Sequence, residues 1–303
     1  MSITTLIATL IWLIGLLAAA LTSAAPLQVA ALHPLMADLT RQVGGERVRV
    51  VDLVADGGNP HHYEPRPGDL ERMQASALVL AAGKGLEPYL NRLMDTLQGV
   101  SFVEVGRTIP SLMAANDGDC VTDAAPAVGT ADPHWWHGVN NMRRAARVVA
   151  LALADKDPAG KAIYLANAQA YGVRLELLQR WASSELAKVP RAQRKLVTAH
   201  NAFAYFAKEF DFTVIAVAGL NDEQNNTPQT LAKTIAAVKH SGVKAIFPES
   251  NANAKVLQSI ATATATTLAT PLIADGNGSG KDAGFEAMLR HNVQAITQAL
   301  ASP

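Results

Sequence analysis

The amino-acid sequence predicts an α/β protein of two lobes, each built on a parallel sheet and joined by a long rigid helix. Short runs rich in branched residues alternate with segments of helical spacing early in the chain, and the same rhythm returns late. A stretch without strand character lies between these two regions. Strands that alternate with helices are typical of parallel sheets. The 303 residues also suffice for two domains, each with a core of its own.

The predicted strands fall into an early group and a late group. The early strands cover residues 27–32, 48–54, 77–82 and 101–106. The late strands cover residues 195–199, 212–218, 245–249 and 267–274. We therefore assign residues 25–139 to an N-terminal α/β lobe and residues 191–303 to a C-terminal α/β lobe.

The stretch between the lobes, residues 140–190, is predicted to be helical. Its second and longer helix covers residues 158–188, after a first one over 140–154. Asp157 can cap free N–H groups at the start of the long helix, where proline is also tolerated. A helix of about 30 residues spans on the order of 45 Å. It is long enough to run along both lobes as a stiff spine that limits hinge motion.

The charge balance and the single cysteine disfavour several classes of protein. Lys plus Arg equals Asp plus Glu, 26 each, so no net field attracts nucleic acid or an anionic membrane surface. Cys120 cannot form a disulfide within the chain and is one thiol short of a CxxC redox or zinc motif. Stability must therefore come from packing.

The first residues indicate an exported protein. Residues 5–20 are apolar, which suits a signal-peptide core better than a membrane span of roughly 20 residues. Thr22 and Ala24 supply the small residues before a cleavage site. We expect residues 1–24 to be a signal peptide and the mature protein to be periplasmic. No Lys or Arg precedes the apolar run, so an uncleaved anchor is the alternative.

Three of the eight histidines lie where binding is more plausible than packing. His61 lies between two prolines, a few residues past a predicted strand, and His134 follows Asp-Pro and precedes two tryptophans. His200 follows directly on the predicted strand 195–199. Open α/β sheets bind ligands at the carboxyl ends of their strands. One such histidine would be read as structural, but three together indicate a metal centre.

A zinc centre takes four ligands, and imidazole nitrogen is one that zinc favours. Asp275 is the candidate for the fourth, because it ends the last strand-like run before a Gly-rich stretch. The alternative interpretation is that Asp275 is an ordinary aspartate in a turn. Glu64 and Glu249 are candidate acceptors for the second N–H of the ligating imidazoles. His62 and His137 are expected to face solvent, with a role as substitute ligands or as groups that support a ligand as the alternative, and the histidines at 33, 240 and 291 are expected to be structural or exposed.

Three motifs give the chain a family resemblance: Pro-His-His-Tyr-Glu-Pro at 60–65, Asp-Pro-His-Trp-Trp at 132–136 and His-Asn-Ala-Phe-Ala-Tyr-Phe at 200–206. They resemble the motifs of the cluster A-I zinc and manganese solute-binding proteins of bacterial ABC importers. The resemblance runs through essentially the whole mature chain. It implies a site in the cleft between the lobes, with two ligands from each lobe: His61, His134, His200 and Asp275.

The resemblance bears on metal choice as well. Zinc-specific members often carry a histidine-rich loop before the second ligand, whereas residues 114–131 contain no histidine. Some zinc members also carry a disulfide in the second lobe, which one cysteine excludes. Manganese-specific relatives have a glutamate where this chain has His200. The resemblance thus implies Zn²⁺ as the transported ligand, with manganese or mixed-metal binding as the alternative.

The resulting interpretation is a monomeric binding protein that captures zinc and delivers it to an ABC permease and its ATPase. A periplasmic metallochaperone is a further candidate partner, and nucleic acid is not one. Four protein ligands leave no open position for the activated water that a catalytic zinc requires, which argues against an enzyme. The competing reading is a zinc hydrolase with Asp275 or Glu249 as its general base.

Overall fold

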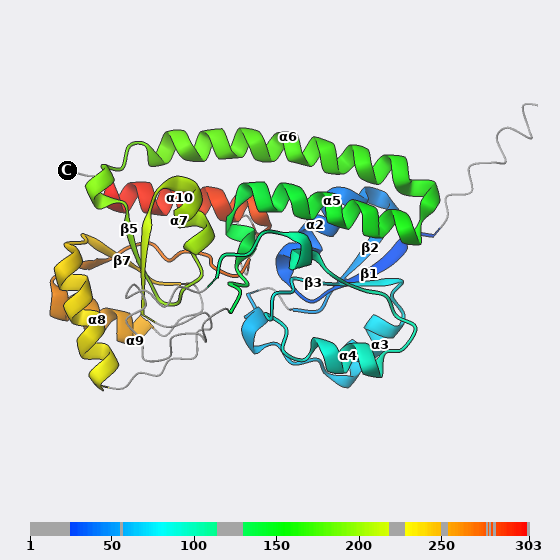
Figure 1. The fold of residues 1–303 in the computed structure, drawn as a ribbon, viewed down its shortest axis with the longest axis horizontal. Coiled ribbons are helices and arrows are strands. Elements are labelled where there is room, and N and C mark those ends of the chain that lie inside the picture. Colours follow the sequence, from blue (N-terminus) through cyan, green and yellow to red (C-terminus); the bar gives the residue numbers. More distant parts are fainter. Residues whose placement is uncertain are drawn as a thin grey trace, which may run out of the picture.

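The computed structural model describes residues 25–54, 57–113, 130–217, 228–249, 254–276, 278, 280 and 283–301. The expected signal peptide and Cys120 lie outside these residues. Two α/β lobes stand side by side beneath one long helix, α6 (Lys161–Leu186), as Figure 1 shows. The predicted fold class is confirmed.

The N-terminal lobe contains a four-stranded parallel sheet in the order β2-β1-β3-β4. Its strands are β1 (Leu27–Ala31), β2 (Val48–Asp52), β3 (Leu78–Ala81) and β4 (Phe102–Glu104). Its helices are α2 (Pro34–Gly44), α3 (Pro67–Gln74) and α4 (Leu90–Thr96). Parallel neighbours require crossover connections, which these helices provide. Val29 of β1 pairs with both Val50 and Leu78, and β3 is buried along its whole length.

The C-terminal lobe repeats this topology, with a parallel sheet in the order β6-β5-β7-β8. Its strands are β5 (Lys195–Thr198), β6 (Thr213–Ala216), β7 (Ala245–Phe247) and β8 (Thr267–Leu268). Its helices are α7 (Ala204–Phe210), α8 (Pro228–Ser241), α9 (Ala254–Thr264) and α10 (Phe285–Leu300). In both sheets the first strand of the lobe is flanked by the second and third. Because neighbouring strands are parallel, the carboxyl ends of the first strand and of its two neighbours lie at the same edge of each sheet.

The eight predicted strands are present, but the last one is much shorter than predicted. The run 267–274 forms a strand only over Thr267–Leu268, and one isolated bridge then joins Leu272 to Glu249. Pro271 lies between the two and has no N–H to donate to a sheet ladder. The segment that leads to Asp275 is therefore irregular and needs other contacts to fix it.

The linking helices are α5 (Val139–Lys156) and α6, which runs above both lobes in Figure 1. The 26 residues of α6 span about 39 Å. A short 3-10 turn, Pro158–Gly160, precedes α6, so the helix begins three residues later than predicted. Asp157 caps this turn by accepting from the Gly160 N–H, and it also forms an ion pair with Arg47 at 2.7 Å.

The lobes share one hydrophobic core cluster, which extends from β1 through α5 and α6 to α10. Smaller clusters lie within each lobe. Polar contacts also cross between lobes: Asp38 of α2 accepts from the Phe285 N–H at 2.9 Å, and Glu209 of α7 accepts from the Val139 N–H at 2.8 Å. Separating the lobes would expose the shared core, so the structure favours small relative motions.

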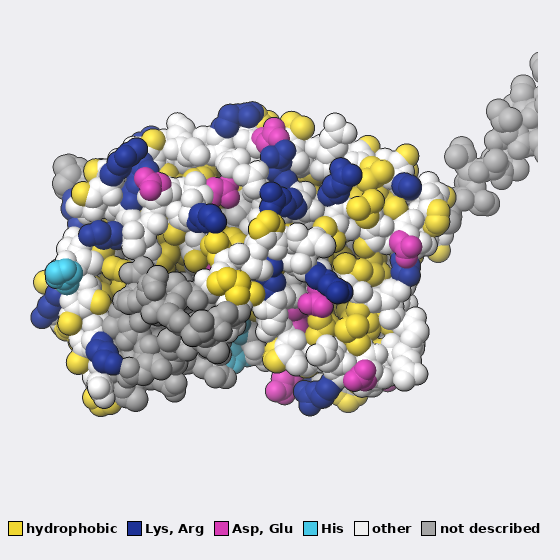
Figure 2. Space-filling model, in the orientation of Figure 1, with side chains coloured by type: hydrophobic (Ala, Val, Ile, Leu, Met, Phe, Trp, Pro, Cys, Tyr) yellow, Lys and Arg dark blue, Asp and Glu magenta, His cyan; other side chains and the backbone are white. Residues whose placement is uncertain are grey.

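Charged side chains of both signs occur on the face of the molecule that Figure 2 shows, where basic and acidic groups are interspersed. Within the described part of the chain, no helix combines the length and the apolar character that crossing a membrane requires.

Candidate metal centre

His61 lies in a short 3-10 helix, Pro60–His62, on the loop that follows β2. The side chain of Asn59 caps this helix by accepting from the His61 N–H at 2.9 Å. Proline at the first helical position adds a fixed backbone angle. The His61 side chain is 7% exposed, so it is the most open of the three histidines predicted as ligands.

His134 precedes the 3-10 helix Trp135–His137, and its orientation is set by Asp132. The Asp132 Oδ1 accepts from the His134 backbone N–H at 2.9 Å and contacts its ring Nδ1 at 2.8 Å. A proton on Nδ1 leaves a lone pair on Nε2, the atom that faces the centre. Trp135 fixes the other side of the turn by donating from Nε1 to the Ala82 carbonyl at 3.0 Å.

His200 follows β5, and its orientation is set by Glu249, which follows β7. These strands are neighbours in the sheet, so their carboxyl ends bring the two residues together. Glu249 accepts from the His200 backbone N–H at 3.0 Å, and its other oxygen contacts the ring Nδ1. The arrangement repeats that of His134: one carboxylate holds both the backbone and the ring of one histidine.

Asp275 lies on the irregular segment after β8, and contacts from both lobes hold this segment. Trp136 Nε1 and His137 Nε2, from the N-terminal lobe, donate to the Ala274 carbonyl at 2.8 and 2.7 Å. On the other side, Asn292 of α10 accepts from the Ile273 N–H and donates to the Ile273 carbonyl, both at 2.8 Å. These hydrogen bonds hold the segment in place of the β-sheet hydrogen bonds that are interrupted at Pro271.

Ligand atoms of all four predicted residues lie within 4.8 Å of one another, in the only such group among the described residues. The His134 Nε2 lies 3.1 Å from that of His61 and 3.3 Å from that of His200. The Asp275 Oδ1 lies 3.4 Å from the His61 Nε2 and 3.8 and 3.9 Å from the other two. Four donor atoms thus face a common point from two lobes.

The electrostatics of the cluster suit a cation. The Asp275 Oδ1 is buried without a hydrogen-bond partner. Burial alone would raise the pKa of Asp275, but the surrounding imidazoles, His200 foremost, hold it well below its usual range. The carboxylate is therefore ionised. A buried anion beside three ring nitrogens is the kind of nitrogen and oxygen set that binds a divalent transition metal.

The predictions for residues around the four proposed ligands were only partly correct. Glu249 is an acceptor for a site imidazole, as predicted, whereas Glu64 is exposed. The expectation that His137 faces solvent is wrong, because the residue is 1% exposed and its ring packs on Phe203 with centroids 4.5 Å apart. The role of Asp132 was not predicted. The signal was available in the sequence, since an aspartate two residues before a histidine can reach both its backbone N–H and its ring.

Comparisons with known proteins agree with the fold. The family described as "Zinc-uptake complex component A periplasmic" matches residues 29–299. A manganese-binding lipoprotein, MntA, of Halalkalibacterium halodurans is 29% identical over 279 residues, covering 91% of this chain and 89% of the relative. The manganese transporter lipoprotein PsaA of Streptococcus pneumoniae is 26% identical and covers 92% of this chain and 91% of its own.

Solved structures show the same fold. The periplasmic zinc-binding protein TroA from Treponema pallidum superposes with a TM-score of 0.82 at 25% identity, covering 92% of this chain and all of that one. A zinc-bound deletion mutant of ZnuA superposes with a TM-score of 0.79 at 24% identity, covering 92% of this chain and 99% of that one.

Gly276 offers a test of how tightly the Asp275 segment is held. Its φ is +66°, and an added Cβ would lie 2.4 Å from the Leu35 side chain of α2. We expect Gly276→Ala to lower the free energy of unfolding by about 1–2 kcal/mol for the backbone and about 1–3 kcal/mol for the overlap. Denaturant titration measures the change.

Gly242→Ala is the matched control, because Gly242 has a φ of +63° and nothing within 4 Å of an added Cβ. The loss of unfolding free energy in Gly242→Ala should therefore reflect only the left-handed backbone conformation. Equal losses in the two variants would contradict the close packing of α2 against the Asp275 segment.

Proposed function

Because the chain belongs to the cluster A-I family of metal-binding solute-binding proteins, which serve ABC importers, we propose that it captures zinc and delivers it to such an importer. The observation that carries the proposal is the convergence of three imidazole nitrogens and one buried carboxylate oxygen. We assign His61, His134, His200 and Asp275 as the ligands of one metal ion per chain.

Zinc is favoured over manganese by the chemistry of the donor atoms. Zinc is satisfied with four ligands and binds imidazole well, whereas manganese prefers oxygen donors in larger number. The Irving–Williams order also places zinc above manganese for a given nitrogen and oxygen site. The relatives MntA and PsaA are named for manganese and TroA for zinc, so the choice rests on the residues of this chain. Three histidines against one carboxylate favour zinc.

The protein binds and transfers its ligand without a chemical reaction, because its family is non-enzymatic. The hydrolase reading is therefore rejected. The structure supplies a physical reason that agrees: Glu249 is occupied with the backbone and ring of His200, which leaves it unsuited to act as a general base. Asp275 faces the three ring nitrogens as a ligand would.

As a component of a metal ABC transporter, the protein acts outside the cytoplasm with a permease and an ATPase. We further propose a periplasmic location, with cleavage after Ala24 and a monomeric mature protein. A periplasmic metallochaperone remains a candidate donor of the metal. The relatives MntA and PsaA are named as lipoproteins.

Alanine variants of the four ligands test the assignment. We expect one tight zinc ion per wild-type chain and a loss of more than about 100-fold for His61→Ala, His134→Ala or His200→Ala, beyond the 10–100-fold typical of outer groups. Asp275→Ala should lose less, because water can replace one oxygen. Affinity should also fall below about pH 6.5, where free imidazole becomes protonated.

Calorimetric titration gives both affinity and stoichiometry, with circular dichroism as a check on folding. The control is His240→Ala, since His240 is exposed on α8. Wild-type binding by any one of the histidine variants would remove that residue from the ligand set.

Metal choice is tested at His200. His200→Glu leaves two nitrogen and two carboxylate ligands, a shell closer to what manganese prefers. We expect zinc affinity to fall and the preference for zinc over manganese to shrink. Competition titrations with both metals measure this, with His240→Glu as the control for added charge. A wild type that prefers manganese, or an unchanged preference in His200→Glu, would refute the zinc assignment.

A further inference from the structure

His33 is a buried histidine beside the metal centre to which the proposed function gives no role. It follows β1 at the carboxyl edge of the N-terminal sheet and caps α2. Its side chain is fully buried, and its ring packs on Trp136 with centroids 4.4 Å apart. Trp136 in turn packs against His134, with centroids 5.3 Å apart. One aromatic ring therefore separates His33 from a proposed ligand.

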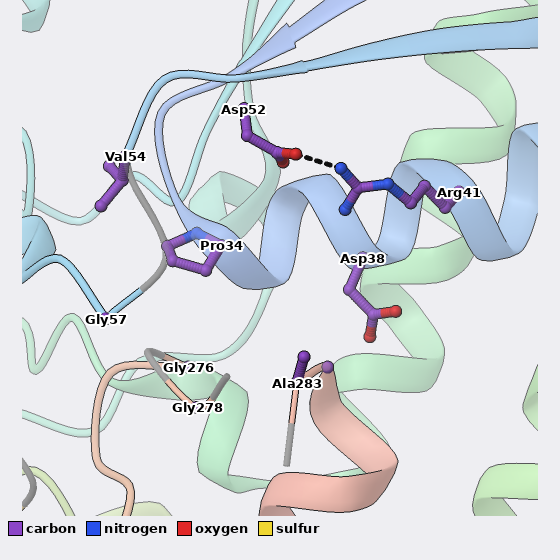
Figure 3. Close-up of a pocket in the computed structure, with 10 residues that line it drawn as sticks. Pro34, Asp38, Arg41, Asp52, Val54, Gly57, Gly276, Gly278 and Ala283 are labelled. Atoms are coloured by element: carbon purple, nitrogen blue, oxygen red, sulfur yellow. Dashed lines mark hydrogen bonds and ion pairs between the residues drawn. The ribbon is translucent and has the colours of Figure 1, made fainter. Parts of the chain in front are cut away.

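The segment around His33 also lies against the segment that carries Asp275. The next residues, Pro34 and Leu35, face Gly276: Leu35 would contact a Cβ at Gly276, and Pro34 lines the same pocket of about 420 Å³ as Gly276. Figure 3 shows these two sides of the pocket, with Pro34 on α2 and Gly276 on the segment that faces it. Of the charged groups around the His33 ring, Asp275 exerts the strongest electrostatic effect.

The tautomer of His33 is fixed by the helix that it caps. Its Nδ1 accepts from the Leu35 N–H at 3.1 Å, so the ring proton is on Nε2. A protonated Nε2 has no lone pair for a metal, which excludes His33 as a ligand. It is instead a neutral hydrogen-bond donor at the edge of the site.

That donor is buried without a hydrogen-bond partner. A buried donor left unpaired costs about 1–3 kcal/mol, and such groups in native proteins call for an explanation. The structure shows no hydrogen bond between His33 and Asp275, so Asp275 is the acceptor that we consider for the metal-loaded protein. Its Oδ1 faces the three ring nitrogens, and a carboxylate that binds a metal through one oxygen keeps the other free to accept.

We propose that His33 is a positioning residue of the metal centre, whose Nε2–H holds the second oxygen of Asp275 and so keeps this carboxylate bound to the metal through one oxygen. The inference rests on the proposed metal-binding function. One-oxygen binding completes a four-coordinate site, which suits zinc. Release of the second oxygen would let Asp275 bind through both, which raises the coordination number in the direction that manganese prefers. His33 thereby contributes to selectivity without touching the metal.

Two substitutions separate this role from helix capping. Asparagine is a favoured N-cap, so His33→Asn keeps an acceptor for the Leu35 N–H but lacks a donor at the position of Nε2. Glutamine is longer and returns an N–H donor to that region, at the expense of the cap. His240→Asn is the matched control on the surface.

We expect His33→Asn to unfold at a somewhat lower denaturant midpoint, because the smaller side chain leaves a void against Trp136, and to bind zinc roughly 10–100-fold more weakly, the range for outer groups at metal sites. Its manganese affinity should change less, so the ratio of zinc to manganese affinity falls. His33→Gln should recover part of that ratio. With Co²⁺ in the site, the strong visible absorption of four-coordinate cobalt should weaken in His33→Asn and not in His240→Asn.

The outcomes distinguish this inference from the proposed function. If wild type binds no zinc, the function fails. If wild type binds zinc through the four ligands but His33→Asn keeps both affinities, or loses them equally, His33 has only a structural role and the inference fails. Equal losses of selectivity in the Asn and Gln variants would overturn the role of the donor.

Discussion

The metal centre depends on two carboxylates, Asp132 and Glu249, that are not themselves in the proposed ligand set. Each binds the backbone N–H of one histidine and also contacts Nδ1 of its ring. A ring held in this way carries its proton on Nδ1 and presents the Nε2 lone pair to the centre. Without this constraint, two of three imidazoles could rotate or exchange tautomers, and the convergence of the Nε2 atoms would be lost.

The site lies between two lobes that share a core. His61 and His134 come from one lobe and His200 and Asp275 from the other, so the distances between donor atoms depend on how the lobes are joined. The helix α6 packs on α2 of the N-terminal lobe, on α10 of the C-terminal lobe and on the other linking helix, α5. Trp136 and His137 then join the N-terminal lobe to the Ala274 carbonyl, next to Asp275. Small adjustments of side chains can therefore admit a metal without a large closure of the lobes.

The sequence was sufficient to predict most of the fold because its signals are local. Branched runs marked the strands, and proline with a capping aspartate marked the start of the spine near residue 158. Histidines that lie beside prolines or at strand ends indicated three of the four proposed ligands. Asp275 could be placed because it precedes a Gly-rich turn, although Pro271 shortens the strand before it to Thr267–Leu268.

The features that could not be predicted depend on contacts between distant segments. His137 is buried because its ring meets Phe203 and the Ala274 carbonyl, and neither lies near it in sequence. His33 adjoins the centre because α2 packs on the 274–276 segment, some 240 positions later in the sequence. Periodicity reports which face of an element is buried, but it does not report which element covers that face.

We propose that one zinc ion binds between the lobes through three histidine Nε2 atoms and Asp275. A crystal structure of the zinc-loaded protein, with anomalous differences recorded on either side of the zinc absorption edge, tests it directly. We expect one strong peak at the centre of the four residues, about 2.0–2.2 Å from each ligand atom. A peak elsewhere, or one bound by fewer than three of these histidines, would contradict it.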